Sequence, residues 1–186
     1  MKYIRSNYRR IKWLIIFGLL GLVIGAFLFY VTDNSIKESI YNILINNSMS
    51  YDYILFHLGL FSFLGILGFI YIGVPFSLFY YFYECLSIGY LVLAISIYYN
   101  FKGIIYSILY IIFFKGIFMA ILAYFIINMV SYTKKKIMFF KMPLNNEYLS
   151  NYLYRCIFTL GLLLVNDLVI LFIGNNVFEL LNNILK

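Results

Sequence analysis

The chain has 186 residues and a net charge of +7; 65% of its residues are hydrophobic and only 11% are charged. Soluble domains carry about 25% charged and about 45–50% apolar residues. A soluble chain of this length could not bury so much apolar surface in one core, so the composition indicates an integral membrane protein. The basic residues flank apolar runs, a pattern that favours anionic lipid headgroups over nucleic acid as their partner.

The first predicted membrane span covers residues 11–31 and follows a basic leader. A membrane helix needs about 20 predominantly apolar residues, which this run supplies. A cleaved signal peptide would have a shorter apolar region and a small-residue cleavage site, and neither is present. The span is therefore expected to stay in the mature chain.

The second and third predicted spans cover residues 53–73 and 76–98, and Gly73-Val74-Pro75 separates them. Proline lacks an N–H donor and disfavours helix at the residue before it, so the turn is assigned to Gly73 and Pro75. Residues 32–52 are polar enough for an outer loop, with a short amphipathic helix expected at 36–45.

The fourth and fifth predicted spans cover residues 104–130 and 152–173. Asn100-Phe101-Lys102-Gly103 forms the turn before the fourth span, and a lysine-rich segment follows it. Gly174-Asn175-Asn176 is expected to end the fifth span before a short amphipathic tail at 177–186. Residues 1–186 are thus predicted to form one all-α membrane domain, a bundle of about five transmembrane helices.

The distribution of basic residues predicts the topology in the cell membrane. With the N-terminus in the cytoplasm and five crossings, the C-terminus lies outside. The outer segments then hold only Lys37, Lys102 and Lys186, as the positive-inside rule requires. The inner segments hold the remaining basic residues of the leader and loops, which are Lys2, Arg5, Arg9, Arg10, Lys12, Lys134, Lys135, Lys136, Lys141 and Arg155.

Small residues at helical spacing predict where the helices pack closely. Membrane helices associate through close backbone approach and polar contacts, because lipid tails are as apolar as leucine. Gly21 and Gly25 form a GxxxG pattern, and packing within the chain or contact with another protein would both explain it. The other glycines assigned to helix packing are Gly65, Gly68, Gly89 and Gly116.

Two ionisable residues, Glu84 and Lys115, stand inside predicted spans, where charges are costly and default to functional candidates. Counted along their helices, they lie about 13 Å and about 14 Å from the inner membrane face. Consecutive antiparallel helices would bring them to the same depth, so we predict an ion pair. The alternative is that each finds its own water or backbone partner.

A second group of polar residues is expected near the outer face. The same count places His57 near the outer end of the second span and Asn166-Asp167 in the outer third of the fifth. These residues are predicted to share a polar outer cluster, although His57 could simply be hydrated and Asp167 could serve only to hold helices together.

Catalytic chemistry is not indicated. The chain contains one histidine, which excludes a histidine-rich metal site, and it lacks the His-Glu-x-x-His and G-x-S-x-G patterns. The sequence predicts no catalytic residue, no metal site and no cofactor.

The order of features resembles the stage II sporulation protein M family over about residues 11–185. The shared features are a glycine-bearing first span, the Gly73-Val74-Pro75 turn, Ser87-Ile88-Gly89-Tyr90 in the third span and a polar centre at Lys115 in the fourth. Phe114 stands where many relatives have proline, and Glu84 stands where relatives often have a basic residue. Lys115 takes the polar place of the fourth span, and its charge is opposite to that of Glu84, which fits a swapped charge pair.

The resemblance implies a role in endospore formation, when the mother cell engulfs the forespore. Members of that family act with two membrane-anchored partners that degrade peptidoglycan, and the resemblance implies a non-catalytic scaffold that localises them. The alternatives are a small transporter or channel component that uses Glu84 and Lys115, and an envelope protein outside sporulation.

Overall fold

The computed structural model describes residues 2–32, 51–70, 72–138 and 146–185, and nearly all of them are helical. The predicted all-α class is confirmed for these residues. The predicted outer loop and its helix at 36–45 lie almost entirely outside them, as do Lys141 and Pro143. The elements in chain order are α1 (Lys2–Val31), α3 (Tyr51–Leu67), the 3₁₀ helix η1 (Gly68–Ile70), α4 (Gly73–Tyr110), the π-helix η2 (Ile111–Gly116), α5 (Ile117–Met138) and α6 (Asn146–Leu185).

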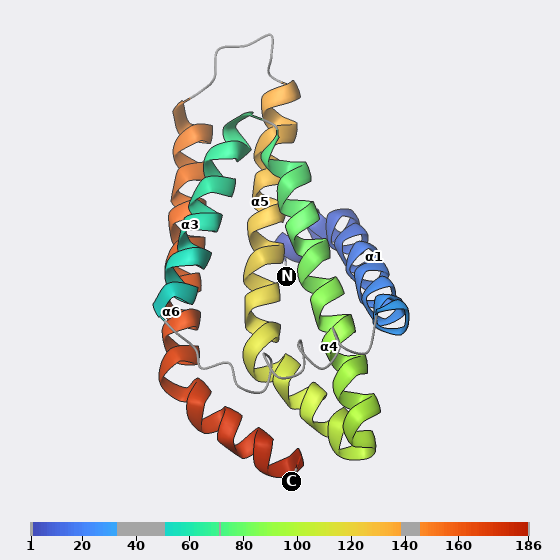
Figure 1. The fold of residues 1–186 in the computed structure, drawn as a ribbon. Coiled ribbons are helices and arrows are strands. Elements are labelled where there is room, and N and C mark those ends of the chain that lie inside the picture. The colour runs from blue at the N-terminus through green and yellow to red at the C-terminus, as the bar shows by residue number, and fades with distance from the viewer. Residues whose placement is uncertain (1, 33–50, 71, 139–145, 186) are drawn as a thin grey trace.

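α3, α4, α5 and α6 run side by side, and α1 packs on the outside of α4 (Figure 1). The largest core cluster joins α3, α5 and α6 through buried side chains such as Phe61, Phe125 and Leu163. A smaller cluster around Ile95, Tyr106 and Phe114 fills the end of the bundle where α4 turns back.

The break between the second and third predicted spans lies a few residues earlier than the sequence indicated. α3 ends at Leu67, η1 follows, and α4 already begins at Gly73. Pro75 therefore stands in the first turn of α4, where its missing N–H removes no helical hydrogen bond. Gly73 is required by the close approach, because a Cβ there would lie 2.4 Å from the amide nitrogen of Gly68.

α4 contains a chain reversal at Asn100, in agreement with the predicted turn. Asn100 has φ 51° and ψ −127°, and the two helical limbs on either side run antiparallel (Figure 1). Asparagine enters positive φ more readily than most residues. Gly103 completes the turn, since a Cβ there would lie 2.2 Å from the carbonyl oxygen of Ile95.

α6 does not end at Gly174, contrary to the sequence prediction. It continues to Leu185, so the predicted amphipathic tail belongs to the same helix. A glycine lowers helix stability by about 1 kcal/mol but keeps its backbone N–H donor. The helical hydrogen bonds of the flanking residues can therefore continue past Gly174.

Within the described residues, three helical stretches are long and apolar enough to cross a membrane, fewer than the five spans predicted. They are Tyr8–Val31, Gly73–Thr133 and Glu147–Gly174. The second of these has 61 residues and contains the reversal at Asn100. α3 has only 17 residues, because η1 replaces its last turn. The apolar helices support a membrane protein by length and composition.

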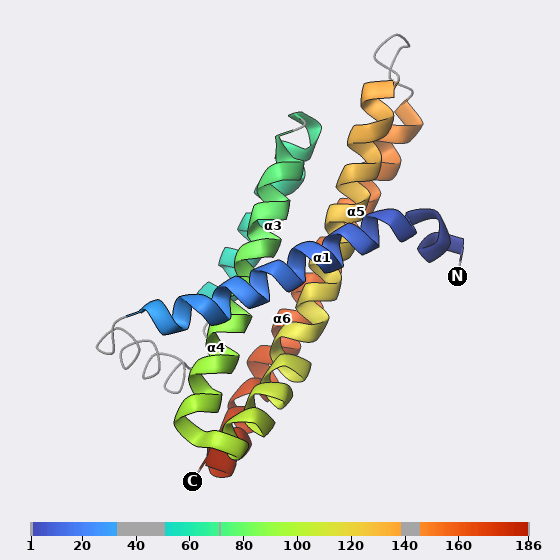
Figure 2. The same ribbon diagram turned by 90° about the vertical axis from the view of Figure 1, so that its right-hand side faces the viewer.

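α1 runs obliquely across the bundle (Figure 2) and packs mainly on α4. Its glycines make this crossing close: a Cβ on Gly25 would lie 2.0 Å from the carbonyl oxygen of Leu86. The reciprocal contact from α4 is similarly close, because a Cβ on Gly89 would lie 2.2 Å from the carbonyl oxygen of Leu22. Gly21 faces Phe82 and Cys85 in the same interface. The GxxxG pattern is thus used inside the chain, between α1 and α4.

A disulfide can test this internal use of the glycine face. A Cβ on Gly18 would lie 3.3 Å from Sγ of Cys85, and Cys85 and Cys156 are both free thiols. An S–S bond of about 2.05 Å puts each Cβ about 3 Å from the partner's sulfur, so Gly18→Cys in a Cys156→Ser background should form a disulfide with Cys85 under mild oxidation. Non-reducing electrophoresis should show a faster-migrating monomer. A cross-linked dimer instead would mean that α1 packs against a second copy.

The remaining glycines assigned to packing behave differently from one another. At Gly68 a Cβ would lie 2.1 Å from the hydroxyl oxygen of Tyr152, which itself donates to the carbonyl oxygen of Gly65 at 2.9 Å. At Gly65 a Cβ would make only ordinary contacts at 3.9 Å. At Gly116 it would meet only the Ile111 carbonyl of its own π-helix, so Gly116 does not mark a close helix–helix contact.

The contact between Gly68 and Tyr152 predicts a coupled pair of variants. Gly68→Ala should destabilise the protein by about 1–3 kcal/mol through overpacking. Tyr152→Phe should cost about 1 kcal/mol, since the Gly65 carbonyl loses its donor. The double variant should lose clearly less than the sum, because the phenol oxygen is the clashing atom. Thermal unfolding in detergent measures the stability of the wild type, both single variants and the double variant. If the two single losses of stability simply added in the double variant, the contact would be contradicted.

Candidate intramembrane polar site

Glu84 and Lys115 are brought together by the antiparallel limbs of the helical hairpin. Nζ of Lys115 donates to Oε2 of Glu84 at 2.8 Å, and their side chains are 15% and 9% exposed, respectively. Glu84 lies on α4, and Lys115 lies in η2 after the reversal. Consecutive antiparallel helices therefore place the two residues at one level, as their spacing from the turn required.

Lys115 stands in an unusual backbone segment. Residues Ile111–Gly116 form a π-helix, a rare widening of the α-helix that is frequent at functional sites. Phe114 is buried within this segment. The helix is irregular here although the segment contains no proline.

His57, Asn166 and Asp167 form the second polar group. Nδ1 of His57 lies 3.1 Å from Oδ2 of Asp167, and Nδ2 of Asn166 donates to Oδ1 of Asp167 at 3.1 Å. His57 is 2% exposed and Asp167 is 1% exposed. The pair joins α3 to α6, and neither residue is merely hydrated at an interface.

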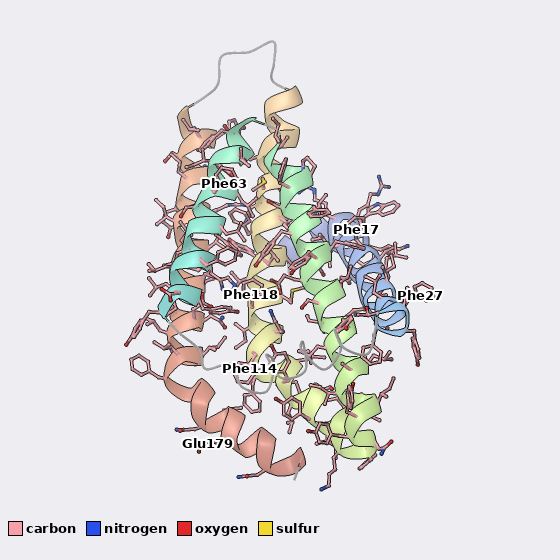
Figure 3. The ribbon with its side chains drawn as sticks, in the orientation of Figure 1. Phe17, Phe27, Phe63, Phe114, Phe118 and Glu179 are labelled. Atoms are coloured by element: carbon pink, nitrogen blue, oxygen red, sulfur yellow. The ribbon has the colours of Figure 1, made fainter. Side chains whose placement is uncertain are left out.

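The two polar groups form one continuous site around Phe118. The Phe118 ring stacks on His57 with centroids 4.7 Å apart, and Nζ of Lys115 lies 5.6 Å from its centroid. Figure 3 shows Phe118 in the middle of the bundle. The sequence count placed Glu84 and Lys115 about half-way across the membrane core and the His57 group near the outer face, but the contacts with Phe118 bring the two groups together. α3 begins at Tyr51, part of the way along the bundle (Figure 1), and His57 follows about two turns later.

Two tyrosines complete the site and were missed by sequence analysis. The Tyr53 ring lies 4.0 Å from the His57 ring, and Tyr80 contacts Phe118 edge-on with centroids 6.5 Å apart. Each tyrosine stands four residues before an ionisable residue of the site, His57 or Glu84. That i, i+4 spacing places side chains on one helix face and could have indicated both tyrosines.

The arrangement is suited to fixing helices against one another. The Glu84–Lys115 ion pair links the two limbs of the hairpin, the His57–Asp167 contact links α3 to α6, and the Phe118 ring lies against both His57 and Lys115. Within the described ranges, no group of three or more His, Cys, Asp or Glu side chains could hold a metal ion.

Comparisons with known proteins give no further assignment. No protein-family model matches the chain, and neither a curated protein nor a solved structure does.

Proposed function

We propose that the chain crosses the cell membrane five times, with its N-terminus in the cytoplasm and its C-terminus outside. The reversal at Asn100 divides Gly73–Thr133 into two antiparallel limbs, each of about 30 residues and long enough for a bilayer core about 30 Å thick. α3 with η1 supplies a shorter crossing. α1 is apolar over 24 residues, about 36 Å, which suits a tilted span.

The distribution of positive charge supports this orientation. Arg10 of α1 donates to Ser131 of α5, about one helical turn before the Lys134–Lys136 stretch. Arg155 lies close by, because its Nη1 donates to Oδ1 of Asn128 on α5 at 2.9 Å. Clustered Lys and Arg at one end mark the cytoplasmic side.

In this orientation the chain serves as a non-catalytic scaffold that localises membrane-anchored peptidoglycan-degrading proteins during forespore engulfment. The order of sequence features shared with the stage II sporulation protein M family supports the biological role. The observation that carries the scaffold reading is that Glu84 pairs with Lys115 and His57 pairs with Asp167 within the chain. Buried polar side chains that are paired between helices hold those helices in place.

Affinity purification of the tagged protein from sporulating cells in a mild detergent tests the scaffold. The expected result is co-purification of peptidoglycan-degrading membrane proteins, absent from an untagged strain. The Glu84→Leu/Lys115→Leu double variant should retain these partners, since an apolar pair can replace a buried ion pair. Recovery of the protein without partners, together with normal sporulation of a deletion strain, would refute the role.

A transporter or channel component is the second candidate. It is favoured by one observation: the Glu84–Lys115 ion pair lies next to the buried His57–Asp167 contact, and Lys115 stands on a π-helix. Ionisable groups inside membranes often mark ion or proton pathways. A transporter should lose transport in proteoliposomes when Glu84 and Lys115 are both replaced by leucine, while a scaffold should keep its assembly.

A further inference from the structure

An open apolar groove lies between α1, α4 and α5, beside the basic residues near the start of α1. Its volume is about 360 Å³, and its walls include Trp13 and Phe17 of α1, Leu78 of α4 and Ile127 of α5. Arg10 is the charged residue on its rim. A groove of this kind offers a single apolar chain a wall of aliphatic and aromatic side chains.

A small polar pocket of about 110 Å³ lies next to the groove. Asn128, Ser131 and Arg155 line it, and Arg155 donates to Asn128 within it. Ser131 connects the two hollows, because it lines the polar pocket and accepts a hydrogen bond from Arg10 on the rim of the groove. The Arg10–Ser131 hydrogen bond thus links the apolar groove to a pocket lined by an arginine, a hydroxyl and amides.

We propose that this composite site binds one anionic phospholipid, with an acyl chain in the groove and the phosphate between Arg10 and Arg155. A guanidinium presents a planar fork of N–H donors that matches phosphate geometry. Arg9 and Lys12 are exposed on either side of Arg10 and add positive charge. The exposed carboxylate of Glu147 at the start of α6 offsets part of that charge. Trp13 is 67% exposed, as suits a side chain at headgroup level. Basic pockets between membrane helices on the cytoplasmic side typically bind anionic headgroups.

This inference needs only that the chain lies in a bilayer, and it does not depend on the scaffold role. Its test is native mass spectrometry of the detergent-purified full chain with equimolar phosphatidylglycerol and phosphatidylcholine of identical acyl chains. The wild type should retain phosphatidylglycerol about fivefold or more over phosphatidylcholine, the effect of about one arginine–headgroup contact. Equal retention of the two lipids would overturn the proposal, and this comparison requires no variant.

Three variants separate the two halves of the site. Arg10→Gln should lower phosphatidylglycerol retention about fivefold and reduce the preference over phosphatidylcholine, while Arg155 keeps part of the site's positive charge. Val130→Trp, which fills the groove from α5, should lower retention of both lipids. Lys102→Gln removes the same charge near the Asn100 turn, at the other end of the bundle, and should change nothing. The proposal fails if Lys102→Gln acts like Arg10→Gln, or if filling the groove has no effect.

Discussion

Replacing Glu84 alone with leucine is expected to destabilise the folded protein by about 3–5 kcal/mol, and Lys115→Leu should do so by a similar amount. Each change leaves the other partner charged and largely buried, since the two side chains are only 9% and 15% exposed. A buried charge that loses its partner carries its whole desolvation penalty, and membrane surroundings supply no water to offset it.

The double variant Glu84→Leu/Lys115→Leu should be close to the wild type in stability. A matched apolar pair can replace a buried ion pair at little cost, because desolvation of the two charges disappears with their attraction. Denaturant or thermal unfolding in detergent gives the stability of the wild type, the two single variants and the double variant. Lys102→Leu is the control for loss of a lysine, since Lys102 is exposed and should be nearly neutral. Single variants as stable as the double would show that the pair does not bear on folding.

The same cycle separates the two candidate functions. A scaffold whose charges only fix helices should bind its partners in the stable double variant. A transporter that uses these charges should lose transport although the double variant stays folded. If the double variant folds and keeps its partners, and a strain that carries it sporulates normally, then Glu84 and Lys115 are not needed for transport.

Much of the helical framework could be predicted because it depends on local sequence. Apolar runs of about 20 residues define membrane helices, and the constant rise per residue placed Glu84 and Lys115 at one level once Asn100 was taken as the turn. The same reasoning failed for His57, because the level of α3 relative to α4 is set by tertiary packing. Residue spacing within one helix does not determine how far that helix is shifted along its neighbour.

The sequence was also a poor guide to where helices end. Gly174 and Pro75 were interpreted as helix boundaries from their local preferences. α6 continues through Gly174, and Pro75 occupies the first turn of α4, where proline is tolerated. The π-helix at Ile111–Gly116 has no simple sequence signature, so the irregular backbone beside Lys115 could not be anticipated from residue types alone.

The glycine pattern illustrates what spacing can and cannot specify. Gly21 and Gly25 predicted a close helix contact, but spacing left open whether its partner was inside the chain. The partner is α4, and Gly89 is its reciprocal position: each helix brings a backbone carbonyl against a glycine of the other. α1 crosses obliquely at this point (Figure 2), as glycine-mediated crossings allow. The close contact thus fixes both the position and the tilt of the first predicted span.

Gly25→Ala and Gly89→Ala are accordingly expected to destabilise the protein by about 1–3 kcal/mol or more each. The added methyl groups would lie 2.0 Å and 2.2 Å from backbone oxygens, which cannot rotate away as a flexible side chain would. α1 must then move off α4, and the disulfide between Gly18→Cys and Cys85 should form more slowly or not at all. Thermal unfolding in detergent and this cross-linking rate measure the two consequences independently.

Gly59→Ala and Gly161→Ala are the matched controls, since a Cβ at either position meets nothing within 4 Å. Alanine is a better helix former than glycine by about 1 kcal/mol, so these two changes should leave stability unchanged or raise it slightly. The contrast isolates the α1–α4 crossing from the general effect of removing a helical glycine. If Gly25→Ala and Gly89→Ala unfolded at the same temperature as the controls, α1 would not pack on α4 through its glycine face. The GxxxG pattern would then have to serve a contact with another protein.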